Sequence, residues 1–215
     1  KVIVSDSAFA SASKGFICKL YGKTSHAAEP ERGNSPALAM SEIVKGIMSL
    51  PTDLKGLKSF NLATIIHVRL GERAFGTTPG YAEVMATLRS YYNEDMEILT
   101  KGAESVATKI ASKNKLGIDM EYTEEFPATV NKPETTAFIR QAAQEFGHRT
   151  VDLEEPFRWS EDFGHFTENF EGAMFGIGVG EGHPDLHNPD YDFKDEIIPV
   201  AYDVYGEIIN KILNN

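Results

Sequence analysis

The sequence predicts an α+β fold for residues 12–125, on three observations. Two runs, 61–70 and 81–91, alternate apolar and polar residues as half-buried strands do. Two longer runs, 34–51 and 93–112, repeat apolar residues at the spacing of amphipathic helices. The resulting order, β-α-β-β-α-β, is that of the ferredoxin-like split βαβ motif: a four-stranded antiparallel sheet with both helices on one face.

Each element of this motif has a local signal. The first strand is expected over residues 14–23, where apolar residues recur at every second position. The helix over 34–51 opens with Ser35 as its expected N-cap and a proline at the first helical position. Residues 115–125 supply the last strand. An edge strand of such a sheet is a natural place for a second subunit to pair.

After about residue 126 the pattern changes. A helix is expected over 131–147, a short glycine-broken strand over 172–180, and a closing helix over 196–213. These elements are too few to close a sheet of their own and indicate part of a second domain. Because the sequence also begins with an apolar strand-like run and no initiator methionine, we expect it to be a fragment of a longer protein.

Charge and composition exclude several classes of function. The formal net charge of −11 argues against nucleic-acid binding, which requires a basic surface. Residues 145–196 hold fourteen acidic residues against three basic ones, so they are either a solvated acidic face or a field that concentrates cations near His187. No apolar run reaches the roughly 18–20 residues of a membrane span. Cys18 is the only cysteine, so no internal disulfide forms and a reducing, cytoplasmic setting is the default.

Two histidines lie in segments suited to chemistry. His187 lies in "PDLHNPDYDF", among aspartates, where it could be a metal ligand. His26 follows a strand in a loop, where binding groups concentrate, although a single histidine is more often a satisfied polar side chain. The run "GIGVG" leads into no helix, so a dinucleotide site is not favoured.

Two stretches carry a resemblance to a known family. "GKTSHAAEPERGNSPA" and "SEDFGHF…GAMFGIGVGEGHPDLHNPDYDFKDEIIP" resemble segments of the family-20 zinc metallopeptidases, in the branch of aminoacylases, N-acyl-amino-acid amidohydrolases and auxin-conjugate hydrolases. The resemblance implies that residues 12–125 are an α+β lid, or dimerisation, domain inserted in an α/β zinc-peptidase catalytic domain. Residues 126–215 would be the C-terminal portion of that catalytic domain and residues 1–11 the end of its N-terminal portion. The rest of that portion would precede residue 1.

The resemblance also implies a role for individual residues. His187 matches the C-terminal metal ligand, and His26 matches the lid histidine that stabilises the oxyanion of the scissile amide across a homodimer. Arg89 matches an arginine that binds the substrate carboxylate. The alternative is that Arg89 is a surface charge at a strand end with no binding role. Glu161 matches a glutamate near the pocket, and Gly178 lies in a strand that brings backbone close to the substrate.

The implied activity is cleavage of the amide bond in an N-acyl amino acid or small peptide by zinc-activated water, with two zinc ions in the complete enzyme. The fragment alone is expected to be inactive and its "LHNPDYDF" loop metal-free or weakly occupied. The alternative is a non-catalytic dimerisation or binding module, if the native chain starts near Lys1. No membrane partner is expected.

Two departures from the family pattern bear on substrate preference. Gly76 stands where many relatives carry an asparagine that contacts substrate. Arg158, Trp159 and Ser160 precede Glu-Asp-Phe where many amidohydrolases have Gly-Gly or Gly-Ser, and we expect their bulk to reshape the pocket.

Overall fold

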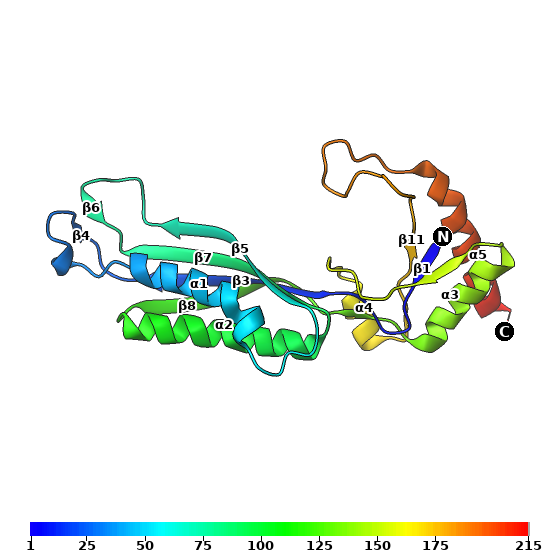
Figure 1. Cartoon of the computed structure of the whole chain (residues 1–215), viewed down its shortest axis with the longest axis horizontal. Coiled ribbons are helices and arrows are strands. Elements are labelled where there is room, and N and C mark those ends of the chain that lie inside the picture. The colour runs from blue at the N-terminus through cyan, green and yellow to red at the C-terminus, as the bar shows by residue number, and fades with distance from the viewer. Residues whose placement is uncertain (215) are drawn as a thin grey trace. The chain divides into compact units, whose positions relative to one another are not determined.

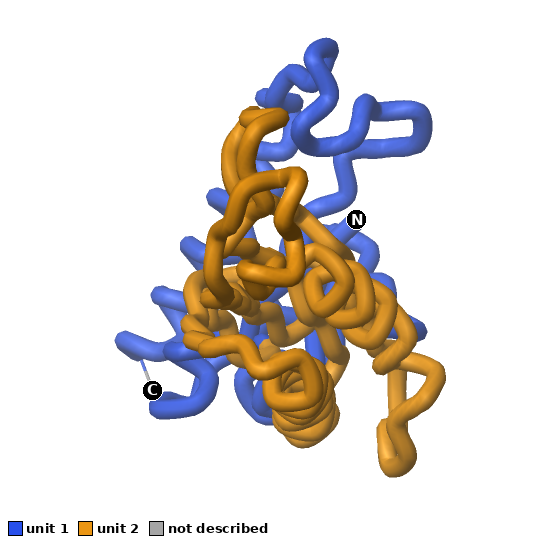
Figure 2. The backbone as a smooth tube through the Cα atoms, turned by 90° about the vertical axis from the view of Figure 1, so that its left-hand side faces the viewer, with its two compact units in different colours: residues 1–10, 129–157, 162–215 blue, residues 11–128, 158–161 orange. Residues whose placement is uncertain are grey.

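The computed structural model describes residues 1–214 and divides into two compact units (Figure 2). Unit 1 comprises Lys1–Ala10, Thr129–Phe157 and Asp162–Asn215, and unit 2 comprises Ser11–Ala128 and Arg158–Glu161. The assignment of such stretches to a lid and a catalytic domain remains a prediction. Among the described residues, no helix has the length and apolar character needed to cross a bilayer.

Unit 2 is built on a four-stranded sheet in which each neighbouring pair is antiparallel. Its strands are β3 (Ala12–Tyr21), β5 (Asn61–Leu70), β7 (Tyr81–Ser90) and β8 (Gly117–Phe126), in the order β5-β7-β3-β8. The first and third strands of the motif are therefore central, as in the split βαβ arrangement. This confirms the predicted four-stranded antiparallel sheet.

Both long helices of unit 2 cover the same face of this sheet (Figure 1). They are α1 (Ala37–Asp53) and α2 (Asn93–Lys113). One continuous core contains buried residues of both helices, such as Ile43 and Leu99, together with alternating apolar residues of β3 and β7, such as Phe16 and Val84. Because successive strand side chains point to opposite faces, sharing one core places the two helices on one side.

The start of α1 differs from the expectation. Pro36 is the N-cap, since its carbonyl accepts the first helical bond, from the Met40 N–H at 2.8 Å, and the helix begins at Ala37. Ser35 was expected to be the cap and is not, although its hydroxyl accepts a long hydrogen bond from the Ala37 N–H, at 3.4 Å. A proline with ψ near 3° is outside the helical run, so the helix starts one residue later.

Unit 1 contains a three-stranded sheet, which the elements after residue 126 do not form alone, because its central strand comes from the start of the chain. Its central strand is β1 (Val2–Val4), parallel to β10 (Thr150–Asp152) and antiparallel to β11 (Gly176–Ile177). β2 (Ala8–Ala10) and β9 (Thr129–Val130) pair separately. The strand expected over 172–180 is only two residues long.

Helices complete unit 1. They are α3 (Pro133–Glu145), α4 (Gly164–Asn169) and α5 (Ile198–Leu213), the last preceded by a 3-10 turn, η2 (Asp195–Ile197). Val2 and Val4 of the sheet pack with Ile139 of α3 and Val204 of α5 in a small core. His148 is partly buried, and its Nε2 lies 2.9 Å from Asp203 Oδ2 of α5.

Candidate functional site

The structure places the five predicted site residues in both units. His26, Arg89 and Glu161 belong to unit 2, and Gly178 and His187 belong to unit 1. Each group is therefore described within its own unit.

His26 lies on a small two-stranded antiparallel sheet. β4 (Ser25–His26) pairs with β6 (Thr77–Thr78), with His26 opposite Thr77. The hydroxyl groups of Ser25 and Thr78 lie 2.8 Å apart and join the two strands. The His26 ring is exposed, and its Nδ1 accepts a hydrogen bond from the Ala28 N–H at 3.1 Å. In the neutral ring this leaves the proton on Nε2, so Nε2–H is the donor that the ring presents.

Gly76 directly precedes β6 of the same small sheet. Its carbonyl accepts a hydrogen bond from the Ala27 N–H at 3.0 Å, which extends the contact between the two strands by one further bond. Phe75, the residue before it, is fully exposed. A hollow of about 570 Å³ in this unit is lined by residues such as Lys23, Glu72 and Tyr81, and by none of the predicted site residues.

Arg89 lies near the end of β7 and is partly buried. Its Nη1 donates to the Arg158 carbonyl at 3.0 Å and to the Ser160 hydroxyl at 2.9 Å. Burial lowers the pKa of the guanidinium, and the nearby Glu124 charge acts in the opposite direction. Glu124 is itself unusual, because it has a φ of +49°, in the left-handed region, where β8 changes register against β3.

Glu161 is exposed and directly follows the segment that Arg89 binds. Two further contacts attach this segment to the rest of unit 2. The Trp159 carbonyl accepts from the Ser11 N–H at 3.1 Å, and the Arg158 guanidinium lies 4.4 Å from the centre of the Phe60 ring. Glu161 is therefore one residue from a hydroxyl bound to Arg89, so the structure brings these two predicted site residues into one neighbourhood.

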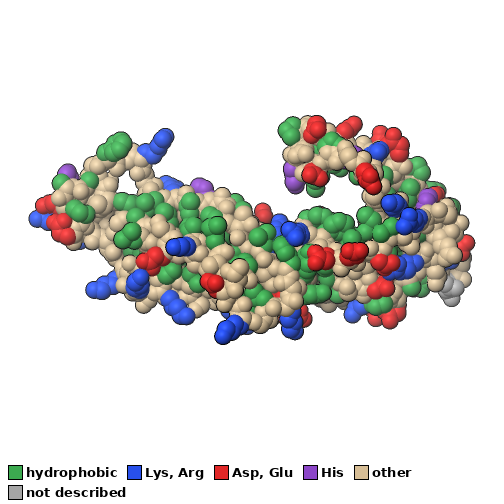
Figure 3. Space-filling view, in the orientation of Figure 1, with side chains coloured by type: hydrophobic (Ala, Val, Ile, Leu, Met, Phe, Trp, Pro, Cys, Tyr) green, Lys and Arg blue, Asp and Glu red, His purple; other side chains and the backbone are tan. Residues whose placement is uncertain are grey.

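His187 lies in the long loop before η2 and is exposed, with a φ of +74°. Such a conformation is uncommon for a residue other than glycine and is often found at functional sites. The loop is braced by His183, whose ring nitrogens lie 2.8 and 2.9 Å from the carbonyl oxygens of Pro184 and Asp192. Acidic side chains gather on this part of the unit (Figure 3).

The surroundings of His187 do not form a complete ligand group within the described residues. Within residues 1–214 no three histidine, cysteine or acidic side chains are grouped closely enough to hold a metal ion. A protein zinc site needs at least three protein ligands. The described residues alone therefore show no complete ligand group, and a metal-binding role for His187 remains a prediction.

Gly178 follows β11, and its N–H donates to the Lys1 carbonyl at 3.0 Å. A Cβ at this position would meet that carbonyl oxygen at 3.8 Å, an ordinary contact. The packing of the described chain therefore does not itself require glycine here.

Sequence reasoning missed the groups that hold these residues in place. The hydroxyl of Ser160 and the carbonyl of Arg158 fix Arg89, and His183 braces the loop of His187. Arg158 and Ser160 belong to the Arg-Trp-Ser run that departs from the family pattern, but the sequence did not indicate that they contact Arg89.

Comparisons with known proteins agree with the resemblance found in the sequence. A model of peptidase family M20/M25/M40 matches residues 7–211. An uncharacterized hydrolase of Staphylococcus aureus is 25% identical over 198 residues, which are 89% of this chain and 51% of that protein. The chain thus spans about half the length of the curated relatives it matches.

Solved structures show the same fold. The YXEP protein of Bacillus subtilis, described as a dinuclear metal-binding peptidase, superposes with a TM-score of 0.77 at 20% identity, covering 99% of this chain and 53% of that one. AtUAH, solved in complex with (S)-hydroxyglycine, superposes with a TM-score of 0.76 at 16% identity, covering 100% and 49%. At these identities the likeness establishes the fold alone.

Proposed function

The chain belongs to peptidase family M20/M25/M40, and on this premise we propose that it is part of a metal-dependent hydrolase that cleaves the amide bond of N-acyl amino acids or small peptides. The metal is proposed to be zinc, with His187 as one ligand and the other ligands from residues outside those described. A dinuclear metal-binding peptidase among the structural neighbours supports a metal.

The observation that carries the proposal is the state of His26. Its Nδ1 accepts a hydrogen bond from a backbone N–H, and the Nε2–H donor lies on an exposed ring that a ligand can reach. A donor of this kind suits the oxygen of a scissile amide, which gains negative charge as the carbonyl is attacked. Arg89, a partly buried cation, suits the carboxylate of an amino-acid product or substrate.

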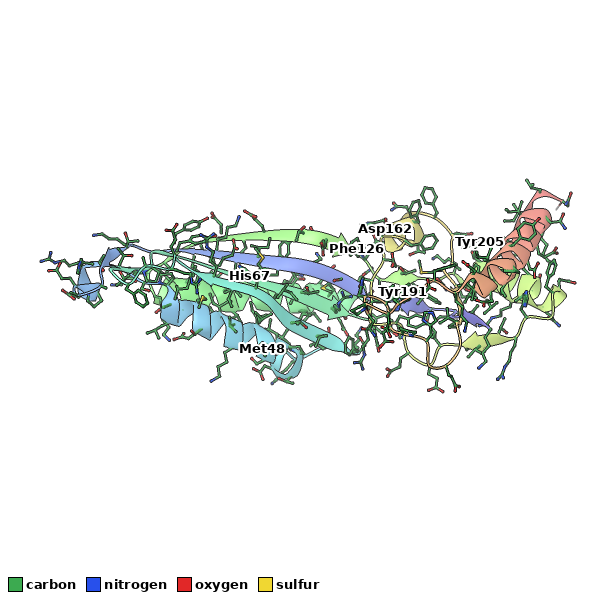
Figure 4. The ribbon with its side chains drawn as sticks, turned by 90° about the horizontal axis from the view of Figure 1, so that it is seen from above. Met48, His67, Phe126, Asp162, Tyr191 and Tyr205 are labelled. Atoms are coloured by element: carbon green, nitrogen blue, oxygen red, sulfur yellow. The ribbon has the colours of Figure 1, made fainter. Side chains whose placement is uncertain are left out.

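The proposal includes a homodimer through unit 2, in which His26 acts in the partner's site. β5 is an edge strand of the sheet, and α1 packs beside it (Figure 4, where Met48 marks α1 and His67 marks β5). Apolar side chains are exposed on both elements: Leu62, Ile66 and Val68 on β5, and Leu38 and Met48 on α1. An open edge with exposed apolar side chains is suited to pairing with a second copy.

A second candidate function is a non-catalytic dimerisation or binding module. The exposed apolar side chains of β5 and α1 support it, because they suit pairing with a second copy whether or not a metal is bound. The two candidates differ in metal content and turnover, not in fold.

The test is hydrolysis by the product of the complete gene. We expect it to release amino acids from a panel of N-acetyl amino acids after zinc loading, to lose activity in chelator and to regain it with zinc. Metal analysis should give bound zinc that His187→Ala lowers. If the metal-supplemented protein binds no zinc and shows no turnover, the binding module is the remaining candidate.

A further inference from the structure

The guanidinium of Arg89 is held by one of its two terminal nitrogens. A guanidinium has five N–H donors in a rigid plane, two of them on Nη1. The Arg158 carbonyl and the Ser160 hydroxyl, at 3.0 and 2.9 Å from Nη1, provide one acceptor for each of these two hydrogens. The donors on Nε and Nη2 form the opposite edge of the plane, which has the spacing that a carboxylate binds with two hydrogen bonds.

The two acceptors belong to the segment 158–161, which is itself fixed to the rest of unit 2. The Ser11 N–H donates to the Trp159 carbonyl at 3.1 Å, between the two acceptor residues. The Arg158 guanidinium lies over the Phe60 ring, whose centre is 4.9 Å from that of Tyr91. The segment that accepts the hydrogen bonds is therefore anchored, and Arg89 itself lies on a strand of the sheet. Hydrogen bonds between two fixed parts set the angle of the Arg89 guanidinium plane.

We propose that Ser160 is a positioning residue, which orients the Arg89 guanidinium so that its Nε and Nη2 edge receives a substrate carboxylate. This inference rests on the proposed role of Arg89 in substrate binding. Without the Ser160 hydroxyl, the Arg158 carbonyl alone would hold Nη1, and the rigid plane would be freer to turn about the Cδ–Nε bond. Binding would then include the entropy loss of fixing the plane.

The first measurement needs no ligand. Nitrogen-15 NMR of the arginine side chains gives the rate of rotation about the Nε–Cζ bond, and Arg89→Lys identifies the Arg89 signal. We expect slow rotation in the unaltered chain, rotation about tenfold faster in Ser160→Ala, and recovery in Ser160→Thr, which keeps the hydroxyl. Ser41→Ala is the matched control, because Ser41 is an exposed serine whose hydroxyl bonds only within α1.

The second measurement is binding of N-acetyl-L-alanine against N-acetyl-L-alaninamide, which lacks the carboxylate. The unaltered chain should prefer the acid, Arg89→Ala should lose the preference, and Ser160→Ala should weaken binding of the acid about tenfold, with Ser160→Thr near normal. Thermal unfolding of each variant checks that it is folded.

The outcomes separate the two ideas. If the unaltered chain does not distinguish acid from amide, the proposed role of Arg89 is wrong and the role of Ser160 falls with it. If the chain prefers the acid but Ser160→Ala changes neither the rotation rate nor the affinity, Arg89 keeps its role and the positioning role of Ser160 is overturned.

Discussion

The Ser59 hydroxyl donates a hydrogen bond of 2.8 Å to the carboxylate of Asp95, a buried acid in the first turn of α2. The backbone N–H groups of Lys58 and Ser59 and the side-chain amide of Asn61 donate to the same carboxylate. Burial alone would raise the pKa of Asp95, but these donors outweigh it and hold the pKa below its usual 3.8. The loop before β5 is thus tied to α2 by one ionised acid.

The first prediction concerns acid stability. Because the pKa of Asp95 is lower in the folded than in the unfolded chain, its contribution to stability is present above about pH 4 and is lost as the pH falls through the folded pKa. Asp95→Ala should lower the free energy of unfolding by roughly 3 kcal/mol at pH 7, since several donors lose a charged acceptor. Urea unfolding at pH 7 and pH 3 measures this, and Asp95→Asn should lose less stability over that interval than the unaltered chain.

Glu97→Gln is the control for this prediction. It removes a charge from the same helix, but the Glu97–Lys101 pair is exposed and 3.5 Å long. Exposed pairs contribute little, so this variant should unfold like the unaltered chain. Equal effects of Asp95→Ala and Glu97→Gln would contradict the account.

The second prediction concerns the reactivity of Cys18. Burial in the core of unit 2 raises the pKa of this thiol to about 12, so at pH 8 roughly one molecule in ten thousand carries the reactive thiolate. We expect no reaction with a thiol reagent in the native chain over an hour and full reaction in urea. Ser35→Cys, an exposed site, supplies the positive control. Rapid labelling of Cys18 in the native chain would show that the core opens.

The third prediction tests His26. In the complete enzyme, His26→Ala should lower kcat by about 100-fold, the usual effect of removing an oxyanion donor. Its melting temperature should stay the same, because the ring is exposed. Glu31→Gln, an exposed residue of the same loop, is expected to retain full activity. A His26→Ala enzyme with normal kcat would remove His26 from the proposed mechanism.

The fourth prediction tests the proposed dimer. Ile66 is 61% exposed on edge strand β5, and a lysine at such a position opposes strand pairing. Sedimentation velocity should show a dimer for the unaltered chain and a monomer for Ile66→Lys. Phe170→Lys places the same charge at an exposed aromatic of unit 1 and should remain dimeric. A dimer that survives Ile66→Lys would place the interface elsewhere.

Regular patterns explain how much of the fold could be predicted. β5 runs over Asn61–Leu70, as the alternation indicated, and α2 over Asn93–Lys113, one residue beyond the predicted end. The two-residue strands β4 and β6 were not foreseen, because periodicity cannot be read from a pair of residues. β10 was missed for a similar reason: its three residues pair with β1, almost 150 positions away, and only that pairing makes them a strand.

The site was predictable only in part. The family resemblance indicated His26, Arg89 and Glu161. The structure adds that Glu161 directly follows Ser160, whose hydroxyl accepts a hydrogen bond from Arg89. One acceptor of Arg89 is the carbonyl of Arg158, which any residue at that position would supply. A backbone group leaves no mark in the sequence, and the left-handed conformation of His187 likewise follows from the loop around it.

The four residues 158–161 have a consequence for dissecting the molecule. They belong to unit 2, although the chain on either side of them belongs to unit 1. A recombinant polypeptide of residues 11–128 would therefore keep the whole sheet and both helices yet leave Arg89 Nη1 without Arg158 and Ser160. If Arg89 binds a carboxylate as proposed, this polypeptide would bind it more weakly than the intact chain does. Fusing residues 158–161 to this polypeptide through a short linker should restore the affinity. The segment would then be a removable part of an otherwise continuous unit.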